Sequence, residues 1–258
     1  MYTNWIFDLY GTLISVHTDE EKELLWQKMS ELYSCWGADY APQQMKEAYH
    51  RICHEEEQIQ LAKGCTYAEI DLADVFVRLY REAPAKHAAA QKPGALKAWS
   101  FAAANTFRVL SRDWLGIYDH TISTLQALKE RGCRIYLLSN AQRVFTIPEM
   151  EQFGLCGLFD GIYISSDAGV KKPDPLFLEK LLRKEKVDRE DTILVGNDFS
   201  SDIRIAMDCG IHSVFLNTDH YVTMDLERRF SEVRLNNDYA PHIIANGDIA
   251  EILNITKE

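Results

Sequence analysis

The chain has 258 residues, of which 47% are hydrophobic and 26% charged, proportions typical of globular proteins. Its 13 Gly and 7 Pro are too few for a collagen-like or low-complexity chain. The 28 Lys and Arg against 39 Asp and Glu give a net charge of −11, which disfavours binding to nucleic acid or to an anionic membrane surface.

The cysteines and the first residues indicate where the chain resides. None of the six cysteines forms a CxxC pair, so we expect no zinc ribbon or thioredoxin-like site and a reducing, cytoplasmic location. The N-terminal segment lacks a basic region and places Asp8 inside its apolar run, which argues against a signal peptide. No apolar stretch reaches the about 18 residues of a membrane span, so no membrane association is expected.

Short apolar segments without alternation predict buried strands, as in a parallel sheet covered on both faces. These segments are residues 5–7, 134–138, 161–164, 192–195, 212–216 and 242–244. Helical patterns separate the later ones, at residues 121–131, 175–186 and 202–209. Strands that alternate with helices predict an α/β fold with a Rossmann-like parallel sheet.

The first two predicted strands are separated by about a hundred residues that favour helices. Heptad-like apolar spacing predicts helices over residues 20–36, 43–60 and 67–82, and an Ala-rich segment at 83–104 continues as helix. We therefore expect an α/β core formed by residues 1–15 and 115–258, interrupted by a helical insertion at residues 16–114. Ligands of open α/β sheets bind at the carboxyl ends of the strands, so this insertion would cover the site.

Polar residues follow the predicted strands where each one ends. Because the carboxyl ends of parallel strands meet at one edge of the sheet, these side chains should converge there. Together they offer a nucleophile, anion ligands and an oxygen-rich metal site. They are Asp8, Tyr10 and Thr12 after the first strand, Ser139 and Asn140 after the second, Lys171 and Lys172 after the third, and Asn197, Asp198 and Asp202 after the fourth.

Four segments in this order, IFDLYGTL, YLLSN, VKKPDP and VGNDFSSDI, resemble the motifs of the haloacid dehalogenase superfamily of hydrolases. The resemblance covers the core, and it implies that the helical insertion is a cap domain. It also implies that Asp8 is the nucleophile and that Thr12 orients the Asp8 loop. In the third motif the lysine that directly precedes the proline, Lys172, matches the family.

The resemblance further implies a set of ligands for substrate and metal. Thr12, Ser139, Asn140 and Lys172 would bind the substrate or its phosphate. Mg²⁺ would be held by Asp8, the backbone carbonyl of Tyr10, Asp198 and Asp202. The alignment leaves Asn197 or Asp198 as the first acidic position of the fourth motif, and we favour Asp198 because its carboxylate is the harder, charged ligand.

Tyr10 departs from the phosphatases of the family, which carry a second Asp there as general acid. A tyrosine has an ordinary pKa of about 10 and is a poor substitute, and loss of a positioned acid costs about 10²–10⁴ in rate. The dehalogenases of the family carry Tyr at this place, since halide leaves without a proton. The residue therefore favours a dehalogenase, whereas the acidic fourth motif favours a metal-dependent phosphatase.

We predict a Mg²⁺-dependent phosphatase of a small, anionic, phosphorylated metabolite that works through an aspartyl-phosphate. Asp8, Tyr10, Ser139 and Lys172 are its predicted catalytic residues. The alternatives are a metal-independent 2-haloacid dehalogenase with an Asp8 ester, and a non-catalytic binding protein on the same scaffold. One arginine of the insertion could hold the substrate anion, but the sequence does not choose among Arg51, Arg78, Arg81, Arg108 and Arg112.

Overall fold

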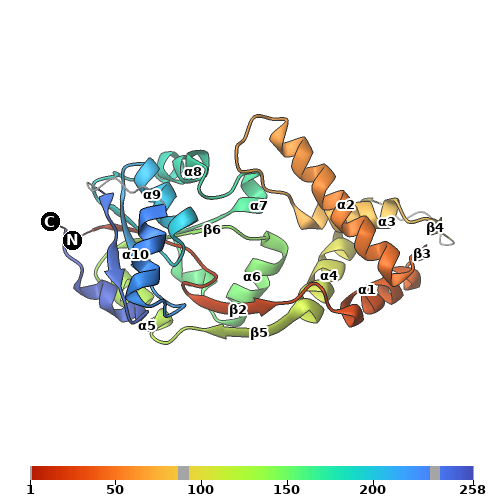
Figure 1. Ribbon diagram of the computed structural model, residues 1–258, viewed down its shortest axis with the longest axis horizontal. Helices are drawn as coiled ribbons and strands as arrows, with labels where there is room; N and C mark the ends of the chain where they lie inside the picture. Colours follow the sequence, from red (N-terminus) through yellow and green to blue (C-terminus); the bar gives the residue numbers. More distant parts are fainter. Residues whose placement is uncertain (1, 87–92, 233–238, 258) are drawn as a thin grey trace.

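The computed structural model describes residues 2–86, 93–232 and 239–257, and the half of the molecule that holds the two chain termini contains a six-stranded sheet (Figure 1). The strand order is β10-β9-β8-β1-β6-β7, and every neighbouring pair is parallel. All six segments predicted as strands lie in this sheet, which confirms the α/β fold. The strands are β1 (Asn4–Phe7), β6 (Arg134–Ser139), β7 (Gly161–Ile164), β8 (Thr192–Gly196), β9 (His212–Leu216) and β10 (His242–Ile244).

Both faces of the sheet are covered, which explains why its strands are apolar without alternation. In β1, Ile6 packs on one face with Phe177 and Leu181, while Trp5 and Phe7 pack on the other face in a cluster that contains Leu125. The helices around the sheet are α5 (Thr121–Glu130), α6 (Arg143–Gln152), α7 (Ser165–Ala168), α8 (Pro175–Glu185), α9 (Arg204–Asp208) and α10 (Thr223–Glu232), with short turns η1 (Cys156–Leu158), η2 (Phe199–Ile203) and η4 (Ile249–Asn254).

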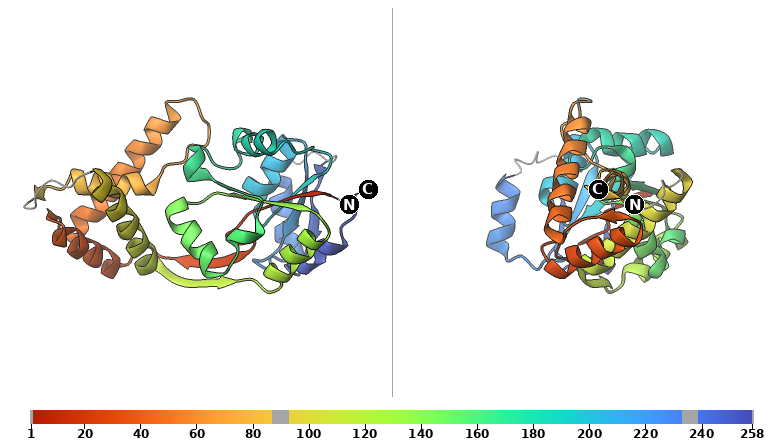
Figure 2. Two further views of the ribbon diagram at one scale, coloured as in Figure 1. Left: turned by 180° about the vertical axis from the view of Figure 1, so that it is seen from behind. Right: turned by 90° about the vertical axis from the view of Figure 1, so that its right-hand side faces the viewer.

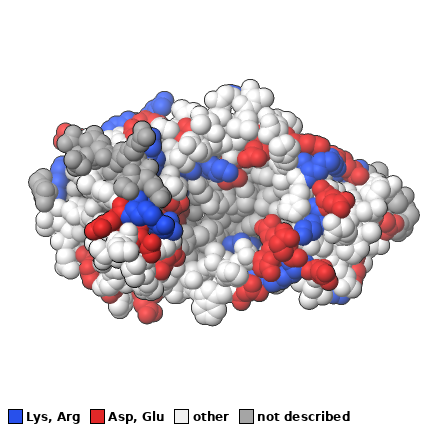
Figure 3. Space-filling view, viewed as in Figure 1, with Lys and Arg blue, Asp and Glu red and all other residues white. Residues whose placement is uncertain are grey.

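Four helices between β2 and β5 pack with one another at the end of the molecule opposite the two chain termini (Figures 1 and 2). They are α1 (Glu23–Cys35), α2 (Pro42–Leu61), α3 (Leu72–Arg81) and α4 (Pro93–Ser111). Their buried side chains form a hydrophobic cluster separate from those of the sheet, and Val144 and Phe145 of α6 join it. In the space-filling view the surface is hollowed between this helical region and the core (Figure 3).

The prediction of helix after helix between residues 15 and 115 is wrong at both ends of that segment. Strands β2 (Ile14–Thr18) and β5 (Arg112–Ile117) form an antiparallel ribbon, and β3 (Ala38–Asp39) pairs with β4 (Ala85–Lys86). The ribbon connects the sheet to the four helices (Figure 1). Its strands are short and half-exposed and their partners lie far apart in sequence, so local periodicity carries little information about the pairing.

Other predicted helices differ in extent. The helix predicted over residues 67–82 is confirmed only as α3, since the residues before Leu72 form a loop that touches the core. The Ala-rich segment continues as α4 to Ser111, while residues 87–92 of that prediction lie outside the described residues. The predicted helix at 202–209 begins earlier, with the turn η2. None of the helices in the described ranges is long and apolar enough to cross a membrane.

Candidate active site

The registers of β1 with its two neighbours bring the predicted site residues to one edge of the sheet. Phe7 pairs with Leu137 on one side and with Val195 on the other, so the residues after these strands emerge together. Asp8 directly follows β1, and its backbone N–H donates to the carbonyl of Val195 at 3.0 Å. Ser139 ends β6, and Asp198 follows β8 by two residues.

Lys172 is the centre of this arrangement. Its Nζ atom donates to Asp8 Oδ1 at 2.6 Å, to Asp202 Oδ1 at 2.6 Å and to the carbonyl of Leu138 at 2.8 Å. The side chains of Lys172 and Asp202 are each only 1% exposed. Burial opposes the charged form of Lys172, but Asp202 and Asp8 together hold its pKa above the ordinary value. Burial also raises the pKa of Asp202 to about 7, against the effect of Lys172.

Two glycines make room for the acidic side chains. A Cβ atom on Gly196 would lie 2.3 Å from Cγ of Asp202, so only glycine lets that carboxylate pack against the end of β8. Gly11 has a φ of +83°, and a Cβ atom there would lie 2.4 Å from the side-chain amide of Asn197. The close approach of these loops therefore depends on missing side chains.

Asn140 fixes the backbone at Lys172. Its Oδ1 atom accepts from the backbone N–H of Lys172 at 2.7 Å, and its Nδ2 atom donates to the carbonyl of the same residue at 3.0 Å. The reciprocal pair ties the loop after β6 to the loop that carries the lysine. Asn140 thus holds Lys172 in place through its backbone.

The two candidates for the first acidic position of the fourth motif have different surroundings. Asp198 caps the turn η2, where its carboxylate accepts from the backbone N–H and hydroxyl of Ser200, both at 2.7 Å, and from the hydroxyl of Ser201 at 2.9 Å. Asn197 lies against Gly11, and its Oδ1 atom accepts from Thr12 Oγ1 at 3.4 Å.

A cavity of about 480 Å³ opens at this edge of the sheet. Among its lining residues, the ones predicted from the sequence are Asp8, Tyr10, Asn140, Lys172, Asn197, Asp198 and Asp202. Thr12 and Ser139 are fully buried beside it and do not line it. The Thr12 hydroxyl donates to Asp8 Oδ2 at 3.5 Å, whereas the hydroxyl of Ser139 has no partner within the described residues.

Five residues that the sequence analysis did not single out also line the cavity: Ser200 and Ser201 of the turn η2, and Asp219, Tyr221 and Arg229. Asp219 and Tyr221 follow β9, so the strand-end argument could have found them if it had been extended to the fifth strand. Arg229 lies in α10 with its guanidinium 4.1 Å from the ring centre of Tyr221, and no local signal marks it.

The charges around the cavity do not balance. Four carboxylates line it, those of Asp8, Asp198, Asp202 and Asp219, against the two cations Lys172 and Arg229. An anionic substrate would meet a net negative cavity unless a cation accompanied it.

We tested whether these residues fit Mg²⁺. No group of three or more His, Cys, Asp or Glu residues is arranged to hold a metal in the part of the chain that the structure describes. Both oxygens of Asp202 are engaged, one by Lys172 and the other by the backbone N–H of Asp198 at 3.1 Å. Mg²⁺, however, usually takes only one or two carboxylates and keeps several waters. Asp8, Asp198 and the Tyr10 carbonyl, all at the cavity, fit that requirement.

The phenol of Tyr10 points to a buried ionic cluster. Its hydroxyl donates to Glu149 Oε2, and Glu149 also accepts from Arg108 Nε at 2.8 Å and from Arg112 Nη1 at 2.9 Å. Burial and the Glu149 carboxylate raise the pKa of Tyr10 well above its ordinary value. The phenol is therefore neutral, and its hydroxyl hydrogen is engaged in the hydrogen bond to Glu149.

Four of the five arginines left open by the sequence separate into two groups. Arg51 and Arg78 form ion pairs with glutamates of the helical region such as Glu55. Arg108 and Arg112 instead meet at Glu149, whose side chain is 4% exposed. These two arginines, from α4 and β5, join the helical region and the ribbon to helix α6 of the core.

Proteins with an open parallel α/β sheet bind their ligands at the carboxyl ends of the strands. The acidic cavity of this chain lies at that position. The model of the haloacid dehalogenase-like hydrolase family matches residues 5–210. The chain belongs to this family and is a hydrolase, which confirms the resemblance drawn from the four motifs.

Similar proteins show how far this likeness reaches. The chain is 29% identical over 102 residues to glyceraldehyde 3-phosphate phosphatase of Methanothermobacter thermautotrophicus, covering 40% of this chain and 45% of that protein. It is 31% identical over 97 residues to phosphoglycolate phosphatase of Vibrio cholerae, covering 38% and 42%. The matched segments thus span less than half the length of either relative.

A solved structure shares the fold over nearly the whole chain. The 2-haloacid dehalogenase from Pseudomonas syringae pv. Tomato DC3000 has a TM-score of 0.63 and 17% identity, covering 98% of this chain and 97% of that chain. At this identity the likeness concerns the fold alone.

Proposed function

We propose that the chain is a Mg²⁺-dependent phosphatase of a small phosphorylated metabolite. The observation that carries the proposal is the pairing of Asp8 with Lys172 at an acidic cavity. Among the residues that the structure describes, Asp8 Oδ2 accepts a side-chain hydrogen bond only from the Thr12 hydroxyl, at 3.5 Å. The excess of carboxylates supports a bound cation over metal-free chemistry. The names of the relatives support a phosphorylated substrate.

In this proposal Asp8 attacks phosphorus in line. A bond forms between a carboxylate oxygen of Asp8 and phosphorus while the bond to the leaving oxygen breaks, and water then cleaves the aspartyl-phosphate. Lys172 orients Asp8 and neutralises charge on the transferring group. Asn140 supports the anion at the cavity, Thr12 and Ser139 support the loops around it from behind, and Asp202 holds Lys172.

Mg²⁺, held by Asp8, the Tyr10 carbonyl and Asp198, would supply Lewis-acid neutralisation of phosphoryl charge. We propose that the helices within residues 16–114 act as a cap over the site. Because the phenol of Tyr10 donates to Glu149, it does not protonate the leaving group in this arrangement.

The test is hydrolysis of 4-nitrophenyl phosphate with Mg²⁺ and with EDTA. We expect activity that requires Mg²⁺ and falls by about 10³-fold or more in Asp8→Asn, since the nucleophile is lost. Absence of phosphate release in the presence of Mg²⁺, together with halide release from 2-chloropropionate that survives EDTA, would reject the proposal. The residue that favours this second candidate, a 2-haloacid dehalogenase, is Tyr10.

A binding protein on the same scaffold makes a different prediction. It would retain its ligand affinity in Asp8→Asn and would release neither phosphate nor halide in the unmodified form. Full activity of Asp8→Asn would reject both enzymatic candidates.

A further inference from the structure

The loop between α2 and α3, residues 62–71, touches the core directly before Lys172. The backbone N–H of Lys171 donates to the carbonyl of Tyr67 at 3.0 Å, and that of Glu69 donates to the carbonyl of Gly169 at 3.2 Å. Ala68 and Val170 form an antiparallel bridge between these bonds. The helical region thus adds a short strand-like pairing to the segment that leads into Lys172.

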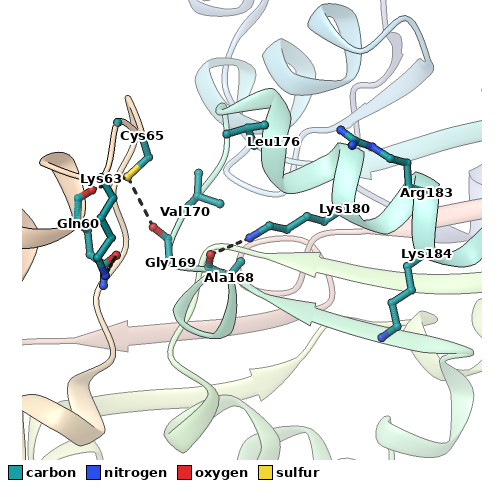
Figure 4. A pocket seen from close by; sticks show the side chains of 11 residues that line it. Gln60, Lys63, Cys65, Ala168, Gly169, Val170, Leu176, Lys180, Arg183 and Lys184 are labelled. Carbon is teal, nitrogen blue, oxygen red and sulfur yellow. Dashed lines mark hydrogen bonds between the residues drawn. The ribbon is translucent and has the colours of Figure 1, made fainter.

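The outer side of this junction lines a cavity of about 650 Å³ (Figure 4). There the thiol of Cys65 donates weakly to the carbonyl of Gly169, at 3.9 Å, and Lys180 Nζ donates to the carbonyl of Ala168 at 2.8 Å. The segment before Lys172 is therefore held by the loop on one side and by α8 on the other.

A second contact involves Gln142, which follows the Ser139–Asn140 pair. Its Oε1 atom accepts from the backbone N–H of Leu72 at 2.8 Å. Its Nε2 atom donates to the carbonyl of Ile70 at 2.9 Å and to Glu69 Oε1 at 3.2 Å. The nitrogen of this amide thus binds the loop 62–71, and its oxygen binds the first residue of α3.

Glu69 completes the junction from the other side. Its Oε2 atom accepts from the hydroxyl of Ser165 at 2.8 Å, and the same hydroxyl accepts from the backbone N–H of Ala141 at 2.8 Å. Burial raises the pKa of Glu69, while Lys171 nearby lowers it and Glu57 raises it further. Through the Ser165 hydroxyl, the carboxylate is linked to Ala141, the residue that directly follows Asn140.

The two contacted segments are themselves joined at the site. Asn140 exchanges two hydrogen bonds with the backbone of Lys172, whose ammonium group lies on Asp8. We propose that Gln142 and Glu69 are positioning residues that couple docking of loop 62–71 to the placement of Lys172 on Asp8. This inference rests on the proposed function, in which Lys172 orients the nucleophile Asp8. A misplacement of about 1 Å in such a group can cost about 10² in rate.

The first experiment compares Gln142→Ala with Gln27→Ala. The control also removes an amide–carboxylate hydrogen bond of the helical region, to Glu31, but far from the junction. We expect Gln142→Ala to lower kcat for 4-nitrophenyl phosphate about tenfold with KM within about twofold, because the transition state is affected more than binding. Hydrogen exchange at the Lys171 amide should become faster. Gln27→Ala should change neither.

A charge exchange separates positioning from general loss of packing. Gln142→Glu places a carboxylate against Glu69, so kcat should fall further than in Gln142→Ala. Adding Glu69→Gln restores one amide and one carboxylate and should recover a large part of kcat. The kcat of Gln142→Glu, divided by the kcat of the unmodified protein, should also rise as the pH falls. Protonation of Glu69 or of the introduced carboxyl group removes the repulsion between them.

The outcomes distinguish this inference from the proposed function. Unchanged kcat and unchanged Lys171 exchange in Gln142→Ala would overturn the coupling, as would a double variant no better than Gln142→Glu. Absence of phosphatase activity in the unmodified protein would reject the proposed function instead. In that case faster Lys171 exchange in Gln142→Ala, recovered in the double variant, would still support the coupling.

Discussion

The ammonium group of Lys172 lies 2.6 Å from Asp8 Oδ1, and the two residues meet although 164 positions separate them in the chain. Asp202, at the same distance from Lys172, makes the group a buried triad of one cation and two carboxylates. A buried charge without its partner is strongly destabilising, so we expect this triad to matter for folding as well as for the proposed chemistry.

Removal of the Lys172 cation should therefore make the protein less stable to unfolding. We expect Lys172→Met to lower the free energy of unfolding by about 3–5 kcal/mol, because it leaves two buried carboxylates uncompensated. Urea titration followed by circular dichroism measures this. The matched control is Lys129→Met, whose partner Asp160 is half-exposed, at a cost of about 0–1 kcal/mol. Equal losses in the two variants would contradict a buried triad.

We expect Tyr10 to limit the leaving groups that the enzyme accepts. Without a general acid, aryl phosphates should turn over far faster than alkyl phosphates, and Tyr10→Asp should narrow this gap by about 10²-fold. Steady-state kcat with 4-nitrophenyl phosphate and with glycerol phosphate gives the ratio. Tyr10→Phe should leave the ratio unchanged, because the hydroxyl donates to Glu149. A selective loss of alkyl activity in Tyr10→Phe would show that the phenol is the acid.

The two candidates for the metal ligand can be separated by substitution. We expect Asp198→Asn to raise the Mg²⁺ concentration for half-maximal activity at least about tenfold, and Asn197→Ala to change it less. Ser201→Ala is the control, because it removes one hydrogen bond of the Asp198 cap and keeps the carboxylate. A larger shift in Asn197→Ala would instead assign the ligand to Asn197.

Gly196 should tolerate no side chain. Gly196→Ala brings a methyl group within 2.3 Å of the Asp202 side chain, and the displacement should cost about 1–3 kcal/mol of unfolding free energy and lower kcat as well. At Gly157 no atom lies within 4 Å of the corresponding position, so Gly157→Ala is the matched control. Thermal unfolding of both variants checks the prediction, and indistinguishable melting curves would refute it.

Glu149 makes the stability depend on pH on the acid side. Burial acts to raise the pKa of Glu149, but Arg108, Tyr10 and Arg112 together hold it below the ordinary value. A depressed pKa stabilises the folded chain above the unfolded value of about 4.3, and this contribution is lost as the pH falls through the folded pKa.

The difference in unfolding free energy between the unmodified protein and Glu149→Gln should therefore shrink as the pH is lowered below about 4.3. Urea unfolding at pH 7 and below pH 4 measures it. Glu31→Gln, at an exposed ion pair, serves as the control. A difference independent of pH would mean that Glu149 is not ionised in the folded chain.

The sequence alone was enough for the six strands, their parallel arrangement and the family. It also predicted that Asp8, Asn140, Lys172 and Asp202 lie together at the strand ends, where they line one cavity, because strand ends and motifs are local patterns. The same argument, extended to the end of β9, would also have predicted Asp219. The approach of these residues follows from the parallel registers, which the alternation of strands and helices already implies.

Other features depended on contacts that no local pattern records. The ribbon of β2 and β5 joins segments about a hundred residues apart. The placement of Tyr10 on Glu149 and the contacts of Gln142 with loop 62–71 likewise join distant segments. Local periodicity reports which face of an element is buried, whereas only the packing of distant elements determines which polar groups meet inside, so these relationships were decided by the tertiary structure.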